Sequence, residues 1–261
     1  MLFPRAIILS RLLVGFLRDQ WPVARKIFFN GLILSSFVTW GSNYFLQDDS
    51  YGMREHVACL SAAMCLVAAY YHLYRFASVL LIDLECKEML IPYVILPISM
   101  VSVILMRYFA LFLLANIVVF TAFAPLAVLF LRGIDTAVSI KLCVGTLLST
   151  VAFFSASAFH VAIVLRSRVH LDNFWVRVVV PLGLLSWMEY ARLGFCKWNL
   201  LISLINAVNP AAHVVKMWRH ALLGEHQNIA WEVSMVVLVA LSVLFLISAL
   251  RQLIKRFDFV C

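Results

Sequence analysis

The polar side chains that could do chemistry gather between residues 192 and 224, a segment too polar for a membrane span and too apolar for a loose loop. The residues of this segment that stand out are the polar Asn209, His213, Lys216, Arg219 and His220, together with Pro210. The proline predicts a break between two short helices, and Gly224 is a typical helix end. We expect this pair to fold into the outer leaflet and turn back out. Non-helical backbone at that depth needs protein or water around it, which predicts a vestibule or a subunit interface.

A second charged segment, residues 83–92, follows the second long apolar stretch. Its acidic residues Glu85 and Glu88 are three apart, as on one face of a helix, and Asp83 is a plausible N-cap. We expect a short helix at the inner membrane face, either a docking element for a cytosolic partner or an ordinary solvated loop helix. Its candidate docking residues are Asp83, Glu85, Lys87, Glu88, Leu90 and Pro92.

Other sequence signals of chemistry are missing. The chain has no G-x-x-x-x-G-K-[ST] phosphate-binding loop and no H-E-x-x-H motif, and its six cysteines form no C-x-x-C pair. We therefore predict no catalytic residue, no metal site and no cofactor in this chain, which is then not an enzyme.

The composition defines the class of protein. Of the 261 residues, 64% are hydrophobic and only 13% are charged, and the mean hydropathy is +0.99. The hydrophobic share exceeds that of a soluble domain and the charged share is lower, and the apolar residues fall in runs of the length that crosses a bilayer. The expected fold is all-α, a polytopic membrane protein in a single transmembrane domain, residues 1–261.

Six spans are the economical count, with both termini cytoplasmic. They cover about 27–46, 56–82, part of 91–131, 142–165, 174–187 and 230–250. The block 91–131 is long enough to cross twice, and the distribution of Lys and Arg over the loops does not decide between one crossing and two. Pro92 and Pro97 favour one crossing, with the helix proper starting near Val101.

Ionisable and aromatic residues near the membrane leave several interpretations open. Arg107 either snorkels to the cytoplasmic interface or faces a substrate. His160 is more often a packed or interfacial histidine than a proton relay. Aromatic residues near the outer side fit an interfacial belt, the default reading. They are Trp187, Tyr190, Trp198, Trp218 and Trp231.

The first 22 residues carry Arg5, Arg11 and Arg18 among apolar residues, without a small-residue cleavage site. This pattern predicts an amphipathic helix, residues 1–22, lying on the anionic inner face of the membrane. Interfacial basic residues account for the net charge of +8, so we expect membrane lipid and no nucleic acid as a partner.

Taken together, these segments resemble the permease subunits of the type-2 ABC exporter family, which move polysaccharides, lipids or drugs out of bacteria. The likeness covers nearly the whole chain: the basic start, six spans, the segment Glu85–Pro92 and the outer hairpin. Its most specific part is P-x-x-H-x5-R, here Pro210, His213 and Arg219, preceded by Asn209.

The resemblance implies roles for these segments. Residues 83–92 would be the coupling helix that docks on an ATPase, and the hairpin 192–224 would form the outer gate. Arg107, Asn209, Pro210, His213 and Arg219 become gate or translocation candidates. ATP and magnesium would bind two separate ATPase subunits, and a second copy of the chain would complete the pore. The implied location is the bacterial inner membrane, and the favoured substrate is a glycan or a lipid-linked molecule.

Rival classes stay open at this point. A non-exporting ABC-type permease, for example in cytochrome maturation, or a drug exporter would share the architecture. A secondary transporter would need coupling-ion groups at the midplane and usually internal repeats, and we find neither. A structural scaffold would not explain the hairpin or the docking helix.

Overall fold

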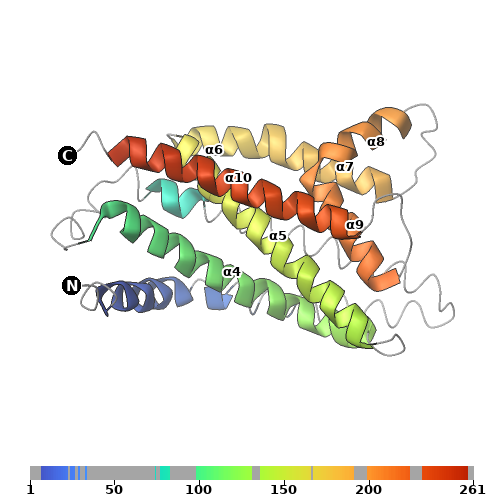
Figure 1. Ribbon diagram of the computed structural model, residues 1–261, viewed down its shortest axis with the longest axis horizontal. Coiled ribbons are helices and arrows are strands. Elements are labelled where there is room, and N and C mark those ends of the chain that lie inside the picture. Colours follow the sequence, from blue (N-terminus) through green and yellow to red (C-terminus); the bar gives the residue numbers. More distant parts are fainter. Residues whose placement is uncertain are drawn as a thin grey trace.

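The computed structural model describes residues 7–22, 24–26, 29, 33, 74, 77–82, 98–130, 136–165, 167–190, 199–223 and 231–257. Within these ranges every regular element is a helix (Figure 1). Three of the helices are long and apolar enough to cross a membrane, over Met100–Ile117, Ile140–Val164 and Trp231–Lys255. The coarse prediction of an all-helical protein with membrane-spanning helices therefore agrees with the structure.

The long block that the sequence left ambiguous contains one unbroken helix, α4 (Met100–Phe130). It begins after Ser99, whose hydroxyl and carbonyl oxygens both accept from the Ser102 amide. Capping of this kind is what a serine supplies at a helix start. The predicted first and second spans, 27–46 and 56–82, lie almost entirely outside the described residues, so the count of six spans stays a prediction.

The next helices run in the opposite direction along the molecule and back again. Helix α5 (Thr136–Val164) returns beside α4, and Ser167 caps the start of α6 (Arg168–Phe174). A π-helical segment, η2 (Trp175–Val179), joins α6 to α7 (Val180–Tyr190). Pro181 follows η2 closely, and a proline cannot donate to the backbone four residues earlier. The wider π turn accommodates that missing bond.

The last part of the chain holds two short helices and one long helix. Helix α8 (Asn199–Val208) and helix α9 (Pro210–Leu223) are separated at Asn209 and precede α10 (Trp231–Phe257). In Figure 1 the junction of α8 and α9 points toward the middle of the bundle, and their other ends lie at the end where α10 begins. We call this pair the α8–α9 hairpin.

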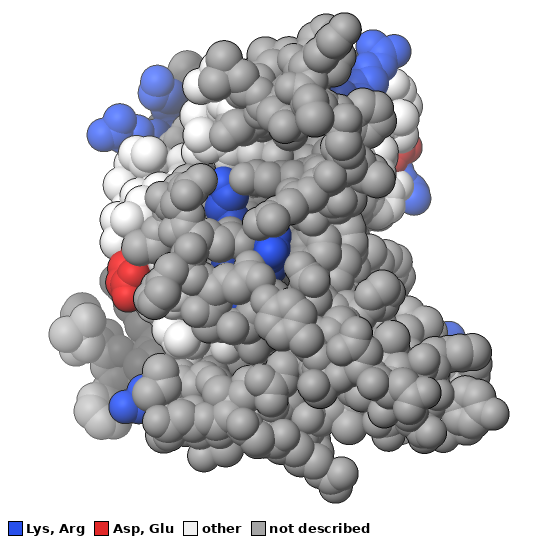
Figure 2. Space-filling view, turned by 90° about the vertical axis from the view of Figure 1, so that its right-hand side faces the viewer, with Lys and Arg blue, Asp and Glu red and all other residues white. Residues whose placement is uncertain are grey.

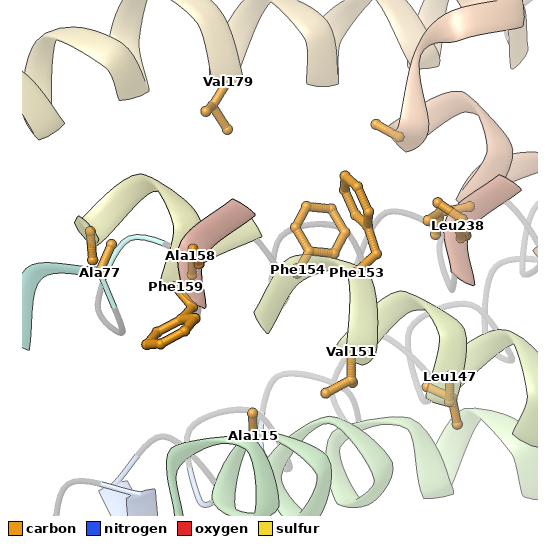
Figure 3. Close-up of a cluster of buried hydrophobic side chains, with 14 of the residues drawn as sticks. Ala77, Ala115, Leu147, Val151, Phe153, Phe154, Ala158, Phe159, Val179 and Leu238 are labelled. Atoms are coloured by element: carbon orange, nitrogen blue, oxygen red, sulfur yellow. The ribbon is translucent and has the colours of Figure 1, made fainter. Parts of the chain in front are cut away.

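Helix α5 forms the centre of the core and packs most extensively on α10 (Figure 3). Its buried face is rich in small residues, among them Ala156, Ala158 and Ala162. Small side chains allow close helix approach, which drives association where lipid surrounds the protein. The hydroxyls of Thr146, Ser149 and Thr150 bond to carbonyls one turn earlier, so they need no partner from water.

Residues 7–22 form the helix expected near the N-terminus. Its apolar side packs on the first half of α4, where Phe16 is buried against Val103 and Ala110. Arg11 and Arg18 are exposed. The helix is thus amphipathic with a protein partner on its apolar side, and its placement on a membrane surface stays a prediction.

Candidate functional site

Asn209 fixes the turn of the α8–α9 hairpin. Its side-chain oxygen accepts from the Ala211 amide at 3.1 Å, which caps α9, and Pro210 occupies the first helical position. Both choices suit a helix start, because the cap satisfies a free amide and proline has none to satisfy. The Asn209 amide group also donates to the Leu182 carbonyl of α7 at 2.8 Å. One residue therefore starts α9 and attaches the hairpin to α7.

His213 joins three helices one turn further on. Its Nε2 lies 3.0 Å from the Ala207 carbonyl in α8, and its Nδ1 lies 3.1 Å from the Ser234 hydroxyl of α10. A carbonyl can only accept, so Nε2 carries the hydrogen, and in the neutral ring Nδ1 accepts from the serine. The imidazole is 2% exposed and thus acts as a buried bridge from the hairpin to α10.

Helix α9 is far more buried than its polar sequence predicts. Met217 and Trp218 are fully buried, and Arg219 is only 7% exposed. The helix packs against α5, α7 and α10 at once. An arginine in such a place must be compensated by protein groups, because an isolated buried charge is costly. Helix α9 lies at one end of the molecule (Figure 1). Figure 2 looks onto that end and shows basic side chains near its centre.

Arg107, the remaining gate candidate, lies in the first half of α4, away from the hairpin. Its guanidinium carbon is 5.3 Å from the centre of the Phe16 ring, a cation–π contact to the N-terminal helix. The structure therefore does not bring Arg107 together with Asn209, Pro210, His213 and Arg219, which all belong to the hairpin. The predicted coupling segment, residues 83–92, lies outside the described residues.

Two polar residues of this site escaped the sequence analysis. Asn206 donates to the Leu185 carbonyl at 3.2 Å, and its side-chain oxygen lies 3.3 Å from the Asn209 amide nitrogen. Ser234 is the α10 partner of His213. The i, i+3 spacing from Asn209 could have identified Asn206 as a residue of this site. No sequence signal identifies the serine, because its partner is distant in the chain.

The outer aromatic belt is corrected in part. Trp218 is 0% exposed, so it is a core residue and does not anchor at a lipid interface. Trp231 donates from Nε1 to the Thr146 hydroxyl at 3.0 Å, and its ring lies over Gly145. Both tryptophans hold helices together. The side chains of Trp187, Tyr190 and Trp198 lie outside the described residues.

The hydrogen bonds of the site join helix to helix, from Asn206 and Asn209 to α7 and from His213 to α8 and α10. No group of three or more potential metal ligands occurs among the described residues. No protein-family model matches the chain, and no curated protein matches it either. The class that the structure defines is an all-helical protein with three described helices able to span a membrane, and with a polar hairpin bonded into one end of the bundle.

Proposed function

We propose that this chain is the membrane-spanning permease subunit of an ATP-driven exporter in the bacterial inner membrane, and that a separate ATPase powers it. The observation that carries the proposal is the α8–α9 hairpin. Its turn reaches into the bundle between α7 and α10, while both its outer ends lie at one end of the molecule. A hairpin that only partly crosses the bundle suits a gate better than a purely structural element.

Polar bonds at the turn hold the hairpin to its neighbours, in addition to the buried side chains of α9. Asn206 and Asn209 bind carbonyls of α7, and His213 binds α10. Each such bond contributes about 1 kcal/mol net, so the three together shift the balance between the closed and the open hairpin by a few kcal/mol. Differential binding of a partner supplies changes of this size. ATP-driven movement of the ATPase would thus be enough to release it.

The proposal has four further parts. The helix at residues 83–92 docks on the ATPase, and two copies of the chain pair to form the pore. The substrate is a glycan or a lipid-linked molecule, which leaves between the hairpins of the two copies. Nucleotide and magnesium bind only to the ATPase.

The test is ATP hydrolysis by the complex purified from its own membrane. The variant Glu85→Lys/Glu88→Lys reverses the charge of the docking face, whereas Glu232→Lys reverses an exposed charge at the start of α10. We expect ATPase activity to co-purify with the wild type and with Glu232→Lys, and to fall at least tenfold with the double variant. All three chains should elute as monodisperse particles in detergent.

Normal ATPase recovery with the double variant would remove the coupling helix from the proposal. An absence of ATPase activity from the wild-type complex, under conditions that keep the chain folded, would overturn the proposal as a whole.

A further inference from the structure

An apolar cavity of about 390 Å³ lies between helices of the bundle, and the hairpin turn with its bonds between Asn209, Leu182 and Ala211 forms part of its wall. Its walls come from α5, from η2 and α7, from the first residues of α9 and from α10. Figure 3 shows Val179 of η2 on one side and Phe153 and Phe154 of α5 on the other. The cavity follows α5 from Phe153 to Leu165, which corresponds to about 18 Å of helix.

The lining excludes a sugar or an ion as the occupant. Phenylalanine, valine and leucine side chains make up most of it, and its polar members are Ser157, His160 and Asn209. The Ser157 hydroxyl already donates to the Phe154 carbonyl, and the Asn209 side chain is bonded to Leu182 and Ala211. A polar solute would therefore lose its water without gaining partners.

His160 is the exception in this lining. Its ring lies 5.3 Å from that of Phe245 between centroids, tilted by 32°, and its Nδ1 is enclosed without a hydrogen-bond partner in the described part of the chain. A buried N–H without an acceptor is costly, so the favoured tautomer carries its hydrogen on Nε2. His160 is four residues from the end of α5, about 6 Å along the helix. A donor is thus available partway along an otherwise apolar cavity, about 8 Å from its Leu165 end.

We propose that this cavity binds one acyl chain of a membrane phospholipid, with an ester carbonyl accepting from His160 and the chain running toward Phe153. The size fits, because a cavity of about 150 Å³ takes the six carbons of benzene, and 390 Å³ then takes on the order of fifteen. Membrane lipid is also at hand to supply the acyl chain, because α5 and α10 are both candidate spans and lipid surrounds such helices. This inference does not depend on the exporter proposal.

Photo-cross-linking tests the site. The full chain is reconstituted in vesicles of phosphatidylethanolamine and phosphatidylglycerol that contain a phosphatidylethanolamine with a diazirine in one acyl chain. One probe carries the diazirine near the ester, and the other carries it at the chain end. We expect the first to label residues near His160 and Leu165 and the second to label residues near Phe153, each at least fivefold above the exposed α10 position Val236.

Two variants fill the cavity and one serves as the control. Ser157→Phe and Val161→Trp should each reduce the cavity labelling at least fivefold, whereas Leu148→Phe, on the exposed face of α5, should leave it unchanged. The second filling variant keeps the test valid if the first does not fold. Equal labelling of the cavity and of Val236, or unchanged labelling in a folded filling variant, would overturn the proposal.

Discussion

At the scale of single residues, the hairpin depends on side chains that serve two neighbours at once. Asn209 caps α9 through its oxygen and binds α7 through its nitrogen. His213 uses both ring nitrogens in the same way, toward α8 and α10. Such residues transmit the position of one helix to another, because neither bond can be kept if the helices separate.

The two roles of Asn209 can be separated by substitution. Serine also caps helices well but lacks the amide that reaches Leu182 and Asn206, so Asn209→Ser should keep the cap and lose these two contacts. We expect it to cost about 1 kcal/mol in the free energy of unfolding in detergent, and Asn209→Ala about 2 kcal/mol because the cap is lost as well. Equal costs for the two variants would mean that only one of the roles matters.

The residue types of this site were largely predictable, whereas their surroundings were not. Asn209, Pro210 and His213 stand out because polar residues and proline interrupt an apolar run. The burial of Arg219 and Trp218 could not be read from the sequence, since it results from α5, α7 and α10 closing around α9. A tryptophan near a span end looks the same in sequence whether it faces lipid or core.

At the scale of elements, α5 and α10 approach each other closely where α10 begins. A methyl group on Gly145 would lie 2.8 Å from the Trp231 ring, closer than real contacts allow. The same tryptophan donates to Thr146 next to it. Glycine is therefore needed at this place for close approach.

Gly145→Ala should destabilise the protein by about 1–3 kcal/mol, because the large, bonded ring has to move. Gly15, in the N-terminal helix, has open space around it and is the matched control. There alanine should be neutral or stabilise by up to about 1 kcal/mol, since it restricts the unfolded chain. Thermal unfolding in detergent measures both, and similar effects of the two substitutions would contradict the assigned contact.

The N-terminal helix and α4 are coupled through the ring of Phe16 and the guanidinium of Arg107. A double-mutant cycle with Phe16→Leu and Arg107→Met should give a coupling energy of about 0.5–2 kcal/mol, because leucine keeps the apolar contact and removes the ring. Additive effects of the two substitutions would show that the arginine acts independently of this helix.

The boundaries of several elements were predictable because prolines and serines mark them. Pro97 and Ser99 precede α4, and Asn209 with Pro210 starts α9. The π-helical segment η2 was not predicted. Its cause, Pro181, is visible in the sequence, but a proline in an apolar run can equally kink or end a helix.

At the scale of the whole molecule, the hairpin and the three long helices form one connected unit. Helix α9 contacts α5, α7 and α10, so a displacement of the hairpin has to move at least one of them. Composition alone predicted the all-helical membrane class. The arrangement of the helices around α9 follows from contacts between distant residues, such as His213 with Ser234, and these have no signature in a single sequence.

The central claim is that ATP opens the α8–α9 hairpin. Ala211, beside the hairpin turn, is 4% exposed and should be shielded while the hairpin is closed. The measurement uses a chain whose six native cysteines are replaced by serine and that carries Ala211→Cys, in membranes together with its ATPase. Glu232→Cys, at the exposed start of α10, is the control.

The rate of labelling by a membrane-impermeant maleimide is compared with and without ATP and magnesium. The account predicts that ATP raises the rate at Ala211→Cys at least tenfold and leaves the rate at Glu232→Cys unchanged. An equal rate at Ala211→Cys with and without ATP, in membranes that hydrolyse ATP, would contradict it.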